Sequence, residues 1–241
     1  MSHRVQDIFA VAPGSPIAER EPDFAHYRRI VLPVSTALTP DRRDAFAVGA
    51  PSTLSVTLAE LAAPACYPSA MDRNTRSQLA LLRELTQLLG RARIRFWLRG
   101  GWALDFHAGQ ITRDHGDIDL VARFRQRSRI LKLLEENGYR AVRFADLASI
   151  HFSKRGQDVA IAFIWTDEMA RTVTPGREFW PWPDDAFGNR RHALHGIACR
   201  AMSVESLLEE KENYEQYSGR PLREKDLVSI KLLRLLQSSR R

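Results

Sequence analysis

The feature that most constrains this chain is a pair of aspartates, Asp117 and Asp119, in the stretch DIDLVARF. The alternation predicts a strand, in which both carboxylates share one face about 6.5–7 Å apart while Ile118 and Leu120 face the core. Two carboxylates so placed repel each other unless a cation lies between them. Mg²⁺ is commonly held by one or two carboxylates together with substrate phosphates. The alternative is a strand face that is acidic by chance, and the D-x-D pattern alone favours that alternative.

Two glycines, Gly100 and Gly101, stand a short distance before the aspartates. The stretch RIRFWLR is predicted to be a strand that ends at this pair, and WALDFHAG to be a short helix after it. Glycines between a strand and a helix let the backbone approach a ligand, and the N–H groups at a helix start bind phosphate. A Gly-Gly pair alone is a common turn. Combined with the D-x-D pattern, it predicts a site for phosphoryl-type chemistry, which needs an immobilised triphosphate and a metal that neutralises its charge.

The rest of the chain from residue 74 onward alternates between helical and extended patterns. Asn74 is expected to cap a first helix that stops at Gly90, and Pro221 is expected to open the last helix. The other predicted helices cover 126–137 and 203–217, and the other predicted strands cover 139–144, 149–155, 158–165 and 196–202. This order predicts an α/β fold, a mixed sheet with flanking helices and an α-helical C-terminal part.

Composition limits the setting in which the chain works. No run of 18 apolar residues occurs, so no membrane span is expected, and the N-terminus lacks the pattern of a secretory signal. The only two cysteines, Cys66 and Cys199, fit a reducing compartment, and we expect a cytoplasmic protein. The net charge of +7 favours phosphate-bearing partners, although an arginine-rich solvated surface explains it equally well.

The stretch RGGWALDFHAGQITRDHGDIDL, residues 99–120, closely resembles the signature of aminoglycoside and lincosamide nucleotidyltransferases, which belong to the DNA polymerase β-like superfamily. The shared pattern is G-G-W-A-x-D, then G-x-x-T-R, then H-x-D-I-D-L. Weaker echoes of related proteins are W-P-W-P at 180–183, LLEEKENY at 207–214 and RPLREKDL at 220–227. The resemblance covers about residues 76–236 and implies a nucleotidyltransferase-type mixed sheet.

With the resemblance, the chain divides into three predicted parts. Eight of the twelve prolines fall within the first 68 residues, where Pro and Gly break up short apolar stretches such as RRIVLPVS and AFAVGAPSTLSV. Residues 1–72 are therefore predicted to be an irregular, partly disordered extension. Residues 73–200 are predicted to form the nucleotidyltransferase domain, and residues 201–241 the C-terminal helical part.

The resemblance also implies the core of a site. Gly100 and Gly101 would hold the phosphates of a nucleoside triphosphate, and Asp117 and Asp119 would bind Mg²⁺. ATP is the expected triphosphate, although another one would fit the same pattern.

A loop of the signature supplies further candidates. Arg113 and His115 would lie beside the triphosphate, and Thr112 would fix their loop. The alternative for His115 is a loop histidine bonded to backbone. Asp105, in the short helix, is expected to brace this loop rather than to act in the chemistry.

Relatives usually supply a third carboxylate from inside a neighbouring strand, where this sequence has Ala160. Asp158 is the only acid of its strand and shares a face with Ala160. We expect Asp158 to take the place of the missing acid, as a further Mg²⁺ ligand or as the group that accepts the hydroxyl proton. A register shift of one residue would send it to the other face.

Residues near the C-terminus are weaker candidates. Lys225 is predicted to bind the triphosphate, and Lys211 is expected instead to pair with an acid on its own helix. Asp226 would orient Lys225 or face solvent. Trp180 and Trp182 are expected to pack under a long loop rather than to stack on a base.

The predicted reaction transfers a nucleoside monophosphate, expected to be AMP from ATP, to a hydroxyl of a small molecule, with an antibiotic as one candidate. The positive charge from residue 76 onward argues against a polycationic aminoglycoside as the acceptor. Two alternatives stay open: a toxin-like enzyme acting on tRNA or protein, and a non-catalytic nucleotide-binding module.

Overall fold

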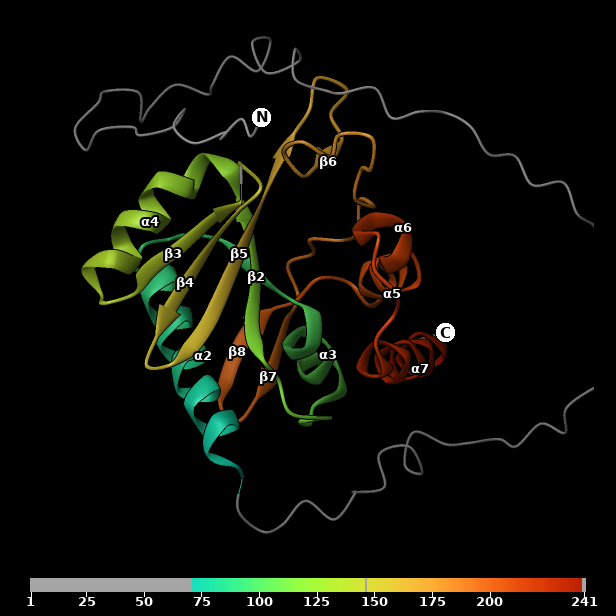
Figure 1. The fold of residues 1–241 in the computed structure, drawn as a ribbon, viewed down its shortest axis with the longest axis horizontal. Coiled ribbons are helices and arrows are strands. Elements are labelled where there is room, and N and C mark those ends of the chain that lie inside the picture. The colour runs from blue at the N-terminus through green and yellow to red at the C-terminus, as the bar shows by residue number, and fades with distance from the viewer. Residues whose placement is uncertain (1–70, 146, 240–241) are drawn as a thin grey trace, which may run out of the picture. The chain divides into compact units, whose positions relative to one another are not determined.

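The structure, a computed structural model, describes residues 71–145 and 147–239. The predicted extension at 1–72 lies almost wholly outside these residues. The described part begins with α2 (Arg73–Arg91) and then alternates strands and helices, which confirms the α/β prediction (Figure 1). The elements that follow are β1 (Phe96–Arg99), α3 (Gly100–Ala108), β2 (Asp117–Arg123), η3 (Phe124–Gln126), α4 (Arg127–Glu136), β3 (Arg140–Ala145), β4 (Ser149–Lys154), β5 (Gln157–Thr166), β6 (Thr172–Val173), β7 (Arg191–Leu194), β8 (Ile197–Arg200), α5 (Val204–Glu212), α6 (Tyr214–Ser218) and α7 (Glu224–Ser238).

The main sheet has the strand order β1-β2-β5-β4-β3, and β6 adds to one end of β5. Strands β2 and β5 are parallel, while β1–β2, β5–β4 and β4–β3 are antiparallel pairs. The predicted mixed sheet is therefore confirmed, and β5 lies between β2 and β4 although it follows both in the chain.

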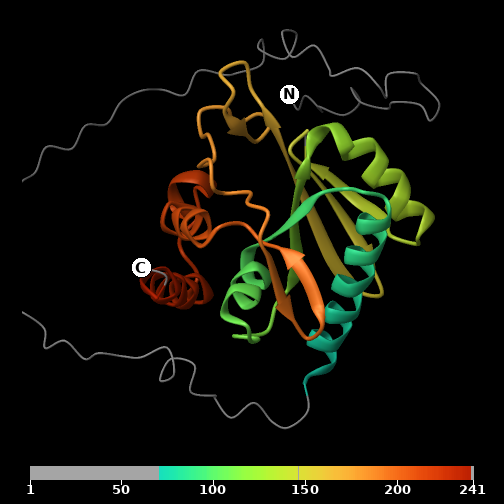
Figure 2. The ribbon, with the colours of Figure 1, turned by 180° about the vertical axis from the view of Figure 1, so that it is seen from behind.

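The two faces of this sheet differ sharply. One face is apolar and buried, and it carries alternate residues of three strands, namely Ile118, Leu120, Val159, Ile161 and Phe152. They face α2 and α4, which cover this side of the sheet, as the view from behind shows (Figure 2). The opposite face carries the alternate residues of the same strands, and the aspartates of β2 lie there.

Helix α2 begins and ends differently from the prediction. Asp72, not Asn74, caps the helix, because its side chain accepts a hydrogen bond from the backbone N–H of Thr75. The Asn74 side chain instead donates to the backbone carbonyl of His115. The helix also runs through Gly90 to Arg91, because Leu79, Leu82, Leu85 and Leu89 remain buried along one stripe to its end.

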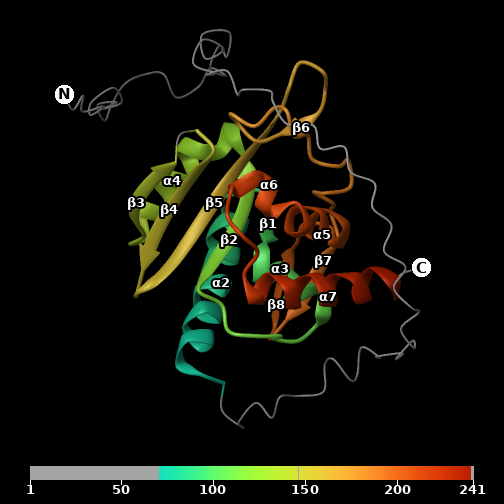
Figure 3. The same cartoon turned by 45° about the vertical axis from the view of Figure 1, so that its right-hand side comes forward.

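The C-terminal part packs into the same hydrophobic core as the sheet. A hairpin of β7 and β8 lies beside β1, where Leu98 bridges Ala201, and α5 and α7 pack against α3 (Figures 2 and 3). The hairpin partner β7 and the short strand β6 were not predicted.

Two predicted boundaries in this part are wrong. The helix expected over 203–217 is divided into α5 and α6 at Asn213. The last helix starts at Glu224, after an N-cap at Arg223, so Pro221 precedes the helix instead of opening it. Among the described residues, no helix is long and apolar enough to cross a membrane.

Candidate active site

A corner between β1 and α3 explains the first glycine of the signature. Helix α3 begins at Gly100, directly after the strand, with a φ of 64° at this residue. A Cβ atom at Gly100 would lie 2.6 Å from Oδ2 of Asp119. Only glycine combines this backbone conformation with so close an approach of the carboxylate. Gly100 therefore allows the start of α3 and the Asp119 carboxylate to lie in contact.

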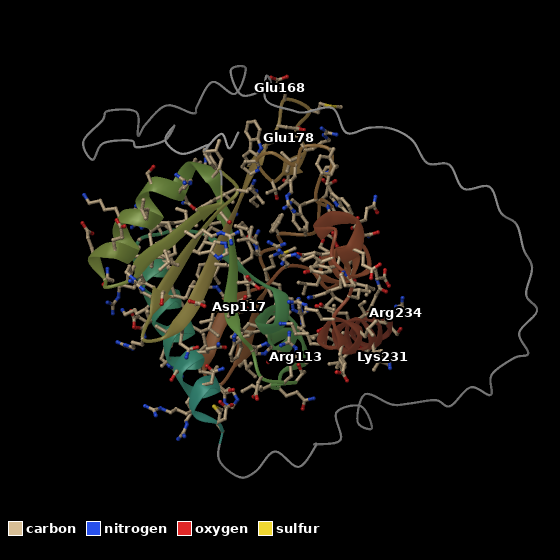
Figure 4. The ribbon with its side chains drawn as sticks, in the orientation of Figure 1. Arg113, Asp117, Glu168, Glu178, Lys231 and Arg234 are labelled. Atoms are coloured by element: carbon tan, nitrogen blue, oxygen red, sulfur yellow. The ribbon has the colours of Figure 1, made fainter. Side chains whose placement is uncertain are left out.

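The second glycine provides room for two side chains of the loop before β2. A Cβ atom at Gly101 would overlap Nδ1 of His115 and lie 2.7 Å from Nη2 of Arg113. The Arg113 guanidinium is therefore at the N-terminal end of α3 (labelled in Figure 4), where N–H groups and the helix dipole favour an anion. The structure thus brings Gly100, Gly101, Arg113 and Asp119 together, as the sequence predicted.

The loop is fixed by a buried network around Asp105. One carboxylate oxygen, Oδ1, accepts hydrogen bonds from the Thr112 hydroxyl at 2.6 Å and from the Thr112 backbone N–H at 3.1 Å. The other oxygen, Oδ2, lies 2.6 Å from Nε2 of His115. Asp105 is fully buried, so it braces the loop, and Thr112 fixes it, as predicted.

His115 is more enclosed than a ligand-binding loop residue. It is 4% exposed, its ring lies 4.6 Å from that of Trp102, and its carbonyl accepts a bond from Gln78. With Nε2 engaged by Asp105, only Nδ1, beside Gly101, is left for a triphosphate. His115 supports the corner, and its contact with a nucleotide stays a prediction.

The two aspartates of β2 share a face, as the alternation predicted, but not the same exposure. Asp117 is exposed at the first position of the strand (Figure 4), and Asp119 is partly buried. Burial and the charge of Asp117 raise the pKa of Asp119 to about 6, against the opposite effect of Arg99. The ionised form of Asp119 is therefore costly until a cation reaches it.

Asp158 lies next to Asp117 across the parallel pair of β2 and β5, and Ala160 lies next to Asp119. Partners in register project from the same face of a sheet, so Asp158 is on the face that carries the other two aspartates. The register shift that would have sent Asp158 to the other face does not occur. Among the described residues, however, no three His, Cys, Asp or Glu side chains converge closely enough to hold a metal ion.

A cavity of about 320 Å³ opens beside these acids. Asp117 and Asp158 line it, and Lys225 reaches it from the first turn of α7. The cavity is also lined by His151, which pairs with Ala160 across β4 and β5. Burial and Arg143 lower the pKa of His151 against the opposite effects of Asp117 and Asp158.

Sequence reasoning missed His151 and the ion pair beside Asp119. Arg99 is paired in register with Asp119, but its Nε–H is shared between the two carboxylate oxygens of Glu210 on α5, at 2.9 and 3.1 Å, and its Nη2 donates to Glu210 as well. Burial would lower the pKa of Arg99, but the Glu210 carboxylate raises it above its usual range. Glu210 is 111 residues from Arg99 in the chain, so no local pattern marks the pair.

The structure places Lys211 and Asp226 differently from the prediction. Lys211 donates at 2.5 Å to Oδ1 of Asp226, on α7, and not to an acid of its own helix. Asp226 is fully buried and also accepts from Nε of Arg223 at 2.7 Å. The expectation that Asp226 orients Lys225 or faces solvent is therefore wrong, because its carboxylate joins α5 to α7.

Trp182 is a packing residue, as expected. Its indole N–H donates to the Thr174 hydroxyl at 3.0 Å, and its ring lies edge-on to Phe187 with 5.7 Å between the centroids. The side chain is partly buried against the hydrophobic core. Glu168 and Glu178, in the same connecting segment, lie at the far end of the sheet from Asp117 (Figure 4).

Comparison with known proteins gives one family match and several relatives. A family model described as aminoglycoside-2''-adenylyltransferase matches residues 81–233. A 2''-aminoglycoside nucleotidyltransferase of Escherichia coli is 30% identical over 70 residues, and one of Klebsiella pneumoniae matches to the same extent. These matches cover 29% of this chain and 40% of each relative, so the chain aligns with less than half the length of these relatives.

Two solved structures share the fold at 20% sequence identity. The crystal structure of ANT(2'')-Ia in complex with adenylyl-2''-tobramycin superposes with a TM-score of 0.56 over 68% of this chain and 96% of that one. The lincomycin-bound lincosamide adenylyltransferase LnuA superposes with a TM-score of 0.52 over 70% of this chain and 99% of that one. The sheet and helices described above are therefore those of a nucleotidyltransferase fold.

Proposed function

The chain belongs to the aminoglycoside-2''-adenylyltransferase family, and from this premise we propose that it transfers a nucleoside monophosphate, AMP from ATP, to a hydroxyl of a small molecule. Pyrophosphate is the second product. The observation that carries the proposal is the contact between the glycine corner and the aspartates, in which Oδ2 of Asp119 abuts Gly100 at the start of α3. A triphosphate site and a cation site are adjacent there.

The phosphates would be bound at the N-terminus of α3. The backbone N–H groups of Gly100 and Gly101 are available at a helix start, and the Arg113 guanidinium is close to Gly101. Lys225 would add a positive charge from α7, on the other side of Asp117. These groups would hold the triphosphate in one orientation and offset its charge, and positioning and charge stabilisation together account for most of the catalysis of phosphoryl transfer.

Mg²⁺ would be held by Asp117 and Asp119. The donor set fits this ion, because two carboxylates on one strand face leave the remaining positions to phosphate oxygens and water, the arrangement that Mg²⁺ prefers. The raised pKa of Asp119 supports the same assignment, since the buried carboxylate lacks a sufficient counter-charge. When bound, the ion would offset the charge that develops on the phosphates.

Asp158 would act on the acceptor. It lines the cavity next to Asp117 and is exposed, so an acceptor hydroxyl can reach its carboxylate. In this role Asp158 takes the hydroxyl proton as the oxygen attacks the α-phosphate. The loop network around Asp105 would keep the corner in register during the reaction.

The predicted division into a nucleotidyltransferase domain, 73–200, and a helical part, 201–241, fits this proposal. The first segment holds the corner and the three aspartates. The second supplies Lys225 and the partner of Arg99, Glu210, which supports a role of the helices in enclosing the nucleotide.

The proposal can be tested with labelled ATP, Mg²⁺ and separate acceptors: tobramycin, lincomycin and bulk tRNA. We expect transfer of label to a small molecule in the wild type and its loss in Asp119→Ala, with Glu135→Ala, an exposed acid on α4, as the control. Transfer that survives Asp119→Ala would overturn the metal assignment. Label on tRNA alone would establish the toxin-like alternative, and ATP binding without transfer to any acceptor would favour the non-catalytic module.

A further inference from the structure

The cavity beside the aspartates lies on the opposite side of β2 from the glycine corner. The corner follows β1, which flanks β2 on one side, whereas β5, β4 and β3 follow in order on the other side. The cavity residues Ala160, His151 and Arg143 lie on these three strands. A triphosphate anchored at the corner therefore leaves the cavity to the molecule that receives the nucleotide.

Arg143 marks the far side of this cavity. Its strand is the third one beyond β2, and strands lie about 4.8 Å apart, so its backbone is about 14 Å from that of Asp119, the residue of β2 that is in register with it. Arg143 pairs with His151 across β3 and β4, which places both side chains on the face of the sheet that carries the aspartates. A sugar-sized molecule can therefore lie between Arg143 and Asp158, with its reacting hydroxyl at the Asp158 end.

The charges around the cavity differ between its two ends. Its lining contains two cationic side chains, Arg143 and Lys225, and two carboxylates, Asp117 and Asp158. None of the ion pairs between described residues includes Arg143 or Lys225. In the proposed function Lys225 pairs with the triphosphate and a divalent ion offsets Asp117, which leaves Arg143 at the far end of the cavity and Asp158 at the near end as the charges that an acceptor meets.

We propose that Arg143 and His151 form an acceptor subsite for a hydroxyl compound that carries an anionic group, a carboxylate or a phosphate. The inference rests on the proposed transferase function and narrows its substrate class. Arg143 pairs with the anionic group, and His151 forms a hydrogen bond to an oxygen of the acceptor between Arg143 and Asp158. A polycationic aminoglycoside would meet Arg143 with a like charge and bind weakly.

Binding can test the subsite separately from transfer. The nucleotide corner is first filled with a non-hydrolysable ATP analogue and Mg²⁺, so that no anion competes for it. Glucuronate, glucose 6-phosphate, glucose and glucosamine, which share a ring but differ in charge, and tobramycin are then titrated by NMR at low ionic strength. The proteins are the wild type, Arg143→Gln, Arg143→Glu and Lys132→Glu, an equal charge reversal on α4, whose exposed side chain lies on the other side of the sheet.

We expect the wild type to bind glucuronate or glucose 6-phosphate at least tenfold more tightly than glucose or glucosamine. Arg143→Gln should abolish this preference, and Arg143→Glu should reverse it and strengthen tobramycin binding about tenfold. Lys132→Glu should change neither. A preference of the wild type for tobramycin, or one that Arg143→Glu leaves unchanged, overturns the subsite. Failure of the wild type to bind the ATP analogue would instead overturn the proposed function, so the two outcomes are distinct.

Discussion

Replacing Gly100 with alanine tests the central feature of the site, the contact between the corner and Asp119. The φ of 64° at Gly100 is unfavourable for a residue with a Cβ atom, at a cost of about 1–2 kcal/mol. The new Cβ would also lie 2.6 Å from Oδ2 of Asp119, which is 0.8 Å less than the 3.4 Å at which ordinary contact begins. The carboxylate must therefore move by nearly an ångström.

A displacement of about 1 Å in a catalytic group lowers the rate by about a hundredfold. We expect Gly100→Ala to lose about 2–3 kcal/mol in the free energy of unfolding, and to lose at least a hundredfold in the rate of pyrophosphate release. The first quantity is measured by urea denaturation and the second by a coupled phosphate assay.

Helix α3 offers a matched control at its other end. Gly109 has a φ of 72°, and a Cβ atom there would meet no other atom within 4 Å. Gly109→Ala should therefore show only the conformational cost, about 1–2 kcal/mol, with the rate nearly unchanged. If Gly100→Ala and Gly109→Ala are alike in both stability and rate, the contact with Asp119 has no role and the reasoning is refuted.

Two further predictions concern buried carboxylates. Asp226→Asn should cost about 3–5 kcal/mol, because it leaves the largely buried ammonium of Lys211 without its counter-charge. Burial would raise the pKa of Asp226, but the hydrogen bonds from Arg223 and Lys211 lower it well below its usual range. The stabilisation is therefore present above about pH 4 and is lost as the pH falls below that value. Urea titrations should show the difference in the free energy of unfolding between wild type and Asp226→Asn becoming smaller over this range. A difference that does not depend on pH would contradict this. Asp105→Ala should lower the free energy of unfolding by about 3 kcal/mol, and with it the rate of nucleotide transfer, because His115 loses its buried partner. Unchanged denaturation curves would show that Asp105 does not stabilise the loop.

Alternation and local signals were sufficient to predict one side of the site. The period of two in DIDLVARF places Asp117 and Asp119 on one face whatever the neighbouring strands are. The glycine pair indicated a strand-to-helix corner, because few other residues accept a φ of 64°. These features depend on the chain within a few residues, so a single sequence is enough to find them.

The other side of the site depends on strand order, which the sequence does not contain. Strand β5 inserts between β2 and β4, which places His151 beside Ala160, and the pairing of β3 with β4 then places Arg143 beside His151. Neither residue stands in a recognisable motif. Likewise, Asp72 displaced Asn74 as the helix cap, because the Asn74 amide binds the carbonyl of His115, 41 residues away. Tertiary contacts decided between two local signals of similar strength.

The pairing of Arg99 with Glu210 leaves the Asp119 carboxylate without a full counter-charge from the protein. Arg99 is the register partner of Asp119 and would be the natural counter-ion of its carboxylate. Instead, two nitrogens of the Arg99 guanidinium donate to Glu210, so this cation is shared between two acids and its hydrogen bonds go to Glu210. The pKa of Asp119 consequently stays raised at about 6 despite the nearby arginine. An internal ion pair between Arg99 and Asp119 would have competed with Mg²⁺ for the carboxylate. The position of Glu210 on α5 therefore makes the C-terminal helices part of the cation site, although they supply no ligand to it.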